Sequence, residues 1–315
     1  MNWIALPDAA VRQSIDSVTV FTEFQHVQAD ARGVSGGMYF KRQGNYEYLV
    51  RTGLDNRQQR IGPRSPETEA VHASFTTKKA RIESRLQSLR QALREAERLN
   101  KALKVGRVPT IVVALLQALQ DAGLADHFRV VGTHALYAYE SAAGVRITPS
   151  ALATQDVDLL WDARKRVGFL ADMARLDTSL LDVLRRADPS FERKEGQLET
   201  AINARGFEVD FLRRQPEGDD PHPFRFSDDE GDLWPVQARR AAALANAPVF
   251  EQVVVGTTGT MAVMRTVDPR TFIEFKRWMA RQRTRPAPRR HRDARQADIV
   301  QALLDEALLA PYEQV

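Results

Sequence analysis

Two aspartates separated by a single residue are the first feature of the sequence that could do chemistry. Asp156 and Asp158 alternate with apolar residues in the segment DVDLLW, which predicts a half-buried strand over residues 156–161. Side chains two residues apart on a strand point to the same face, so the two carboxylates should lie side by side. Asp210 lies in a second segment of the same texture, GFEVDFL, which predicts another strand over residues 206–212.

Three carboxylates on one face of a sheet would repel one another unless a cation lay between them. Mg²⁺ suits such a site because it prefers hard oxygen ligands and keeps part of its coordination shell for water and phosphate. Two such ions can stabilise both the attacking and the leaving oxygen of an in-line phosphoryl displacement. The alternative interpretation is that Asp156, Asp158 and Asp210 are exposed polar positions of ordinary alternating strands.

A glycine–threonine pair at the start of a helix is the second feature. The apolar run FRVV predicts a buried strand over residues 128–131, and Gly132 and Thr133 follow it at the start of a small-residue helix. Free backbone N–H groups at a helix N-terminus bind phosphate, glycine permits a close approach, and the Thr133 hydroxyl can donate a hydrogen bond. The same pair could equally serve only as a helix cap.

The order of these segments resembles the nucleotidyltransferase superfamily with the DNA polymerase beta-like fold. The resemblance spans roughly residues 108–300, and it is similar to minimal bacterial members such as the nucleotidyltransferase toxins of type IV toxin–antitoxin systems. Threonine stands at position 133 where many members have serine, which keeps the hydroxyl. The residues that carry the resemblance are Val131–Thr133, Asp156–Leu160 and Glu208–Phe211, with Arg146–Thr148 and Thr154–Gln155 leading into the D-x-D strand.

This resemblance implies an enzyme that transfers a nucleoside monophosphate from a nucleoside triphosphate, ATP among them, to an acceptor hydroxyl and releases pyrophosphate. Asp156 and Asp158 would hold the metal, as two Mg²⁺ ions or with Mn²⁺ in their place. Asp210 would complete the metal site and favour deprotonation of the acceptor hydroxyl. Gly132 and Thr133 would bind the nucleotide.

Basic residues near the C-terminus are further candidates for nucleotide binding. Lys276 lies in a predicted helix over residues 269–283, and it would contact the β- and γ-phosphates as a helix lysine does in similar proteins. The alternative is a surface lysine on an amphipathic helix. Arg289 and Arg290 belong to a basic run before the last predicted helix, residues 293–309. This run could bind nucleotide phosphates or a nucleic acid, or pair with an acidic segment of the same chain.

Charge is distributed unevenly along the chain. The net charge is only +4, but residues 265–295 contain eleven Lys and Arg against three acids, and residues 217–232 contain seven acids against one Arg. A basic patch attracts polyanions whatever the total charge. RNA, including transfer RNA, is therefore a candidate acceptor, while a protein hydroxyl or a small molecule stays open.

The N-terminal third predicts a separate module. Residues 34–62 alternate aromatic or aliphatic with polar residues around Gly44 and Asn45, which predicts a β-hairpin. Ser65 and Pro66 then start a long basic amphipathic helix that extends to about residue 103. The aromatic and basic hairpin could contribute to an RNA-binding surface, pack on the core or form a dimer.

The predicted fold is α+β, or α/β-like, with a nucleotidyltransferase core in which helices flank a small mixed sheet. The hairpin and long helix form residues 1–104, the core residues 105–235, and a helical C-terminal domain residues 236–315. Within the last of these, GTTGT at residues 256–260 predicts the turn of a short hairpin, because it lacks the Gly-Lys-Ser/Thr ending of a P-loop.

The composition excludes several classes of protein. The chain has 315 residues, of which 43% are hydrophobic and 27% charged, as is typical of a folded domain. It has no cysteine, which excludes disulfides, thiolate zinc sites and cysteine nucleophiles. No signal peptide or apolar run of membrane length is apparent, which predicts a cytoplasmic protein with no membrane partner. The histidines form no metal-ligand pattern. His134 adjoins Gly132 and Thr133, which would place it near the site, but a position at the surface of the helix start is expected instead.

Two other interpretations stay open. One is a nucleic-acid-binding or regulatory module on a vestigial nucleotidyltransferase fold, which the three mutually repelling carboxylates disfavour. The other is a toxin that uses the same chemistry and has a separate antitoxin as its partner. The sequence indicates neither the oligomeric state nor the preferred nucleotide.

Overall fold

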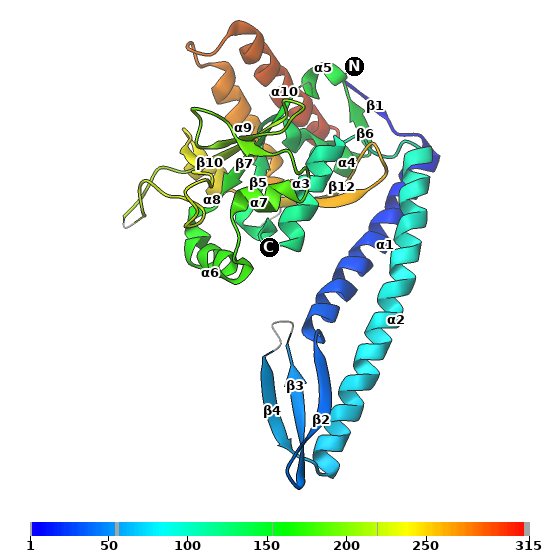
Figure 1. The fold of residues 1–315 in the computed structure, drawn as a ribbon. Helices are drawn as coiled ribbons and strands as arrows, with labels where there is room; N and C mark the ends of the chain where they lie inside the picture. The colour runs from blue at the N-terminus through cyan, green and yellow to red at the C-terminus, as the bar shows by residue number, and fades with distance from the viewer. Residues whose placement is uncertain (1, 54–56, 153, 219, 312–315) are drawn as a thin grey trace. The chain divides into compact units, whose positions relative to one another are not determined.

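A computed structural model describes residues 2–53, 57–152, 154–218 and 220–311 of the chain (Figure 1). Contacts between residues divide the chain into two units, one of Arg12–Asn100 and one that joins Met1–Val11 to Lys101–Val315. The domain boundaries at residues 104 and 235 that the sequence suggested remain predictions. No helix of the described part is long and apolar enough to cross a membrane.

Two long helices form most of the smaller unit. α1 (Asp8–Gly33) and α2 (Pro66–Ala102) lie side by side and antiparallel (Figure 1). The Gln13 side chain donates a hydrogen bond to the Asn100 side chain at 3.2 Å. Their apolar contact consists of Val27 from α1 and Val34, the residue after α1, with Ile82, Leu86 and Leu89 from α2.

The start of α2 confirms the prediction from the sequence. Ser65 Oγ accepts a hydrogen bond from the Thr68 backbone N–H at 3.3 Å, and Pro66 opens the helix. The sequence did not predict α1, because polar Gln13 and Ser17 occupy buried positions where an apolar stripe would be expected.

A three-stranded antiparallel sheet completes this unit. Its strands are β2 (Gly37–Gln43), β3 (Tyr46–Thr52) and β4 (Gln58–Pro63), in the order β2-β3-β4. The predicted hairpin is confirmed as β2 and β3, which pair from Gln43 opposite Tyr46. The hairpin is not the whole sheet, since β4 adds a strand to the free edge of β3. Its segment QQRIGP lacks an alternating apolar pattern, which is why the sequence did not indicate it.

A mixed sheet lies at the centre of the larger unit, as the α+β prediction requires. Its strand order is β5-β7-β10-β9-β8, and β11 also pairs with β10. β7 and β10 run parallel, whereas β5 is antiparallel to β7 and β9 is antiparallel to β10. The strands are β5 (Phe128–Val131), β7 (Asp156–Trp161), β8 (Glu192–Arg193), β9 (Thr200–Ile202), β10 (Glu208–Arg213) and β11 (Val236–Gln237).

Helices and two smaller sheets surround this sheet. The helices are α3 (Thr110–Asp121), α4 (Leu136–Ala143), α5 (Pro149–Leu152), α6 (Arg166–Leu176), α7 (Leu180–Arg185), α8 (Ala241–Asn246), α9 (Pro269–Ala280) and α10 (Ala287–Asp305). The small sheets pair β1 (Trp3–Ala5) with β6 (Val145–Ile147), and β12 (Val249–Val255) with β13 (Met261–Val267). Short 3-10 turns lie at Ala125–His127, Gly132–Ala135 and Ala163–Lys165.

An aromatic cluster anchors one face of the central sheet. Trp161 is buried at the end of β7 and stacks on Phe224, with ring centroids 4.4 Å apart and planes at 7°. Phe226 contacts the same indole edge-on and is also fully buried. Both phenylalanines come from the acidic segment 217–232, which is therefore packed on the sheet. Its Asp220 forms ion pairs with Arg214 and Arg166.

The C-terminal region differs from the prediction in two respects. β12 and β13 are seven-residue strands, so the hairpin around the predicted turn is longer than expected and the region is not purely helical. The last helix begins at Ala287 instead of residue 293, because Pro286 and Pro288 fit the first turn of a helix. Arg289 and Arg290 are therefore helical residues of α10 and do not belong to a linker.

Candidate active site

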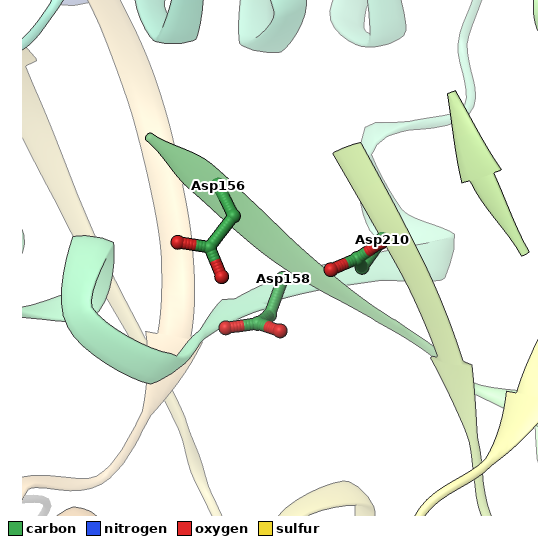
Figure 2. Close-up of side chains that lie close together, drawn as sticks. All are labelled: Asp156, Asp158 and Asp210. Atoms are coloured by element: carbon green, nitrogen blue, oxygen red, sulfur yellow. The ribbon is translucent and has the colours of Figure 1, made fainter. Parts of the chain in front are cut away.

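Asp156, Asp158 and Asp210 meet on one face of the central sheet. β7 and β10 are adjacent, and their register places Asp158 directly opposite Asp210. Each of the three carboxylates has an oxygen within 4.8 Å of an oxygen of the other two. Figure 2 shows the three side chains converging from the two strands. The predicted shared face is confirmed, since the intervening Val157 and Val209 are buried on the opposite side.

Two threonine hydroxyls hold the outer aspartates. Thr154 Oγ1 donates a hydrogen bond to Asp156 Oδ1, and Thr200 Oγ1 donates to Asp210 Oδ1 at 2.5 Å. Thr200 lies on β9 directly opposite Asp210. Each hydroxyl donates to one oxygen of its aspartate, which fixes the rotamer of that aspartate. The second carboxylate oxygen, Oδ2, stays available for a ligand.

The cluster carries more negative charge than its surroundings compensate. Burial and, after it, the charges of Asp156 and Asp210 together raise the pKa of Asp158 to about 7. Burial also raises the pKa of Asp210, although the hydrogen bond from Thr200 opposes this shift. Lys276 and Arg285 oppose the shift of Asp158 only in part. Three hard oxygen donors this close together fit a divalent cation such as Mg²⁺, which would restore the ionised form of all three.

Gly132 is required at its position because of Asp158. Its φ of +68° is a left-handed conformation that favours glycine, and a Cβ atom there would lie 2.1 Å from Asp158 Oδ2. The next residue, Thr133, is buried, and its Oγ1 accepts a hydrogen bond from Gln296 Nε2 at 3.2 Å. Both residues lie in the 3-10 turn that leads from β5 into α4.

A buried ion cluster lies beside the aspartates. Lys276 Nζ donates to Asp293 Oδ1 at 3.0 Å, and Arg285 Nε donates to Asp293 Oδ2 at 2.6 Å. The Asp293 side chain is fully buried and the Lys276 side chain is 4% exposed, so Lys276 is not a surface lysine. Burial lowers the pKa of Lys276, while Asp293 and then Asp158 oppose this shift. Asp293 thereby retains two cations close to the carboxylates.

One cavity of about 650 Å³ contains nearly all of these groups. Of the eight site residues that the sequence predicted, Arg290 alone does not line it among the residues that the structure describes. Its polar end has Gly132, Thr133, the three aspartates, Lys276, Arg285, Arg289 and Arg292, and its apolar end has Leu160, Leu212, Ala238, Ala241, Leu244, Phe275, Trp278 and Met279, with Arg239 beside them. The two ends are continuous because Leu160 and Leu212 pair one step beyond Asp158 and Asp210 on the same sheet face.

The comparison with protein families agrees with this geometry. A family model described as nucleotidyltransferase matches residues 110–315. The chain belongs to this nucleotidyltransferase family. No curated protein and no solved structure matches the chain. The matched part of this nucleotidyltransferase includes every residue that lines the cavity.

Several residues of the candidate site lack a clear signal in the sequence. Asp293 and Arg285 contribute only their charges to the sequence pattern, and the one signal is that Asp293 is the single acid in the basic stretch 281–295. Trp278 follows Phe275 at helical spacing, a pattern that usually indicates a core-facing stripe.

His134 corrects an expectation from the sequence. It was expected at the surface, but its side chain is buried against Tyr137 and Phe207. Burial lowers its pKa to about 4, although nearby Asp156 opposes this shift. His134 is therefore neutral at physiological pH and packs beneath the site.

Gly132→Ala is expected to slow nucleotidyl transfer by at least about 10²-fold, because the new Cβ would displace Asp158. The positive φ adds strain of about 1–2 kcal/mol, so the melting temperature should fall as well. Gly144→Ala is the matched control, since Gly144 has a φ of +62° but nothing lies within 4 Å of its Cβ position. The control should lose stability and keep its transfer rate. Equal rates for the two variants would contradict the assignment of Gly132.

Proposed function

We propose that this nucleotidyltransferase moves a nucleoside monophosphate from a nucleoside triphosphate to an acceptor hydroxyl, with release of pyrophosphate. The observation that carries the proposal is the convergence of Asp156, Asp158 and Asp210 at the end of a cavity that also holds buried cations. Such a site offers both a place for metal and a place for phosphates.

The three aspartates would hold Mg²⁺, as two ions or with Mn²⁺ in their place, and the metal would polarise the reacting phosphate and offset the charge of the transition state. The hydrogen bond from Thr200 keeps the Asp210 carboxylate aimed at the site. Asp210 would also take the proton of the acceptor hydroxyl as a general base.

The triphosphate would lie along the polar end of the cavity. Lys276 and Arg285, both retained by Asp293, would face the β- and γ-phosphates and stabilise the leaving pyrophosphate. Gly132 leaves room for this approach, and Arg289 lines the same end from the first turn of α10.

The nucleobase would occupy the apolar end, where the Trp278 indole is half-buried and lines the cavity. Trp278→Ala should weaken nucleoside triphosphate binding by about 5–20-fold through loss of stacking. It should leave binding of inorganic tripolyphosphate unchanged, as measured by competition in calorimetry. Trp234→Ala, a half-buried tryptophan outside the cavity, is the control and should change neither affinity. If Trp278→Ala weakened the binding of nucleoside triphosphate and of tripolyphosphate equally, the nucleobase would not stack on Trp278.

The acceptor that we propose is RNA, transfer RNA included. The excess of Lys and Arg on α2 and along residues 265–295 supports a polyanionic substrate. We also propose a DNA polymerase beta-like core and an antitoxin partner, which the resemblance implies. A cytoplasmic location is proposed from the composition. The parallel pair β7 and β10 with its three aspartates supports the first of them.

The test is incubation of the full-length protein with each α-³²P-labelled nucleoside triphosphate, Mg²⁺ and total cellular RNA. Label should transfer to RNA in the wild type, and it should be lost with EDTA or in Asp156→Ala/Asp158→Ala. Asp121→Ala/Asp298→Ala, which removes two exposed aspartates outside the cavity, should remain active. Label on protein or a small molecule would refute RNA as acceptor. RNA binding without any transfer would favour a binding module on a vestigial fold.

A further inference from the structure

The outer face of the sheet β2-β3-β4 has an unusual set of side chains. Residues that pair across adjacent strands lie on the same face, and the register pairs Lys41 with Tyr48 and Gln43 with Tyr46. Thr52 pairs with Gln58 and Val50 with Arg60 on the other side of β3. We call this side the tyrosine face; its residues are Tyr39, Lys41, Gln43, Tyr46, Tyr48, Gln58 and Arg60, which surround Val50 and Thr52.

The opposite face of the sheet is covered by α2. The Phe40 ring lies 5.4 Å from the His72 ring, and the Arg51 guanidinium lies 4.6 Å from the centre of the Phe75 ring. Leu49, between them on β3, is fully buried. The tyrosine face is more open, since Tyr46 is 67% exposed and Tyr39 is 39% exposed.

The charges of the two faces differ as well. Glu47 is the one acid in the three strands, and it lies on the side of α2, where it pairs with Arg64 at 2.7 Å. The tyrosine face has Lys41 and Arg60 and no carboxylate of its own. This face is therefore complementary to a negatively charged ligand.

The cations of this face are held among the aromatic rings. The Arg60 guanidinium lies over the Tyr48 ring, and Lys41 Nζ donates a hydrogen bond to Gln58 Oε1 at 3.0 Å. The Tyr46 and Tyr48 ring centroids are 6.4 Å apart. Flat rings interleaved with cations on an open sheet are the arrangement that binds unpaired bases by stacking and their phosphates by charge.

We infer that the tyrosine face binds single-stranded RNA. Bases stack on Tyr39 and Tyr46, and phosphates contact Lys41 and Arg60. The amides of the face and its tyrosine hydroxyls offer hydrogen bonds to 2′-hydroxyl groups. A protein partner fits less well, because the branched aliphatic residue of this face, Val50, is buried. The choice of RNA rests on the proposed function, whereas the stacking site itself does not depend on catalysis.

The test measures fluorescence anisotropy of a labelled, unstructured 15-nucleotide RNA of mixed sequence. The full-length protein would carry Asp156→Asn/Asp158→Asn, so that binding is separated from transfer. In this background, Tyr39→Ala/Tyr46→Ala should weaken binding by at least about tenfold. Tyr39→Phe/Tyr46→Phe, which keeps the rings, should retain most of the affinity. A duplex RNA of the same sequence should bind more weakly than the single strand.

Charge is tested separately by the salt dependence. Lys41→Gln/Arg60→Gln should lower the slope of log K against log salt by about 1.4, the value for two phosphate contacts with a single strand. Arg12→Gln/Arg186→Gln, which removes two exposed arginines outside α2, residues 265–295 and the tyrosine face, is the matched control and should change the slope little. All the substituted side chains are partly or fully exposed. The circular dichroism spectra and melting temperatures of the variants should therefore stay near those of the parent protein.

Three results would overturn the inference. These are absence of RNA binding in the parent protein, unchanged affinity in Tyr39→Ala/Tyr46→Ala, and an equal loss of slope in the Arg12→Gln/Arg186→Gln control. If a DNA strand of the same sequence bound with equal affinity, the ligand would be single-stranded nucleic acid in general, and the choice of RNA would be overturned. RNA binding by this face together with no nucleotidyl transfer by the wild-type protein would refute the proposed function and leave the stacking site intact.

Discussion

Asp158→Asn is expected to abolish nucleotidyl transfer and, at the same time, to stabilise the metal-free protein. The substitution keeps the size of the side chain and removes a charge of the proposed metal site, so the rate should fall by at least about 10³-fold. Stability should rise because burial and the neighbouring Asp156 and Asp210 make the ionised Asp158 unfavourable in the folded state. A site built for function is costly to the fold in the absence of its cation.

The pH dependence of this effect follows from the sign of the shift. The folded-state pKa of Asp158, about 7, lies above the unfolded value of about 3.9. Between these values the folded state retains a proton that the unfolded state has lost, so stability falls as the pH rises through this window and levels off above it. The wild type in EDTA should therefore lose stability between about pH 4 and 7, and Asp158→Asn should lose less.

The measurement is thermal and urea unfolding in EDTA from pH 5 to 8, with a stability difference of about 1–2 kcal/mol in favour of Asp158→Asn at pH 8. Asp121→Asn, at an exposed position at the end of α3, is the control and should match the wild type in both rate and stability. Added Mg²⁺ should stabilise the wild type more than the variant. A variant that unfolds more easily than the wild type at pH 8 in EDTA would refute the assigned electrostatics.

Asp293→Asn is expected to lose activity as well, but with the opposite effect on stability, which should fall. It removes the carboxylate that accepts hydrogen bonds from Lys276 and Arg285 and leaves the Lys276 ammonium buried without that partner. Breaking a buried ion pair on one side costs about 3–5 kcal/mol. The rate should fall by about 10–100-fold, because the two cations lose the group that orients them toward the leaving phosphates.

A double variant separates the structural from the functional contribution. Lys276→Met/Asp293→Leu replaces the buried pair by apolar side chains of similar size, and it should recover stability to within about 1–2 kcal/mol of the wild type. It should not recover the rate, since no ammonium faces the phosphates. Urea midpoints and single-turnover rates provide the two readouts. Wild-type rates in the double variant would show that Lys276 does not take part in the reaction.

The sequence determined those features that depend on neighbouring residues. The alternation in DVDLLW and GFEVDFL put each aspartate on the face opposite its buried neighbours, and the structure confirms both strands. The start of α2 was equally predictable, because Ser65 and Pro66 act through hydrogen bonds and dihedral angles within one turn. Local patterns of this kind specify an element and its exposed face without knowledge of the rest of the chain.

Only the tertiary structure decided which distant segments meet. β7 and β10 are separated by more than forty residues in the chain, and no local pattern specifies that they pair in the register that sets Asp158 opposite Asp210. Burial of His134 depends on the approach of the distant Phe207. Burial of Lys276, and the use of Asp293 to hold two cations, depend on how α9 and α10 pack. Charge and polarity along a sequence indicate what a side chain can do, whereas burial and long-range partners decide its pKa and its role.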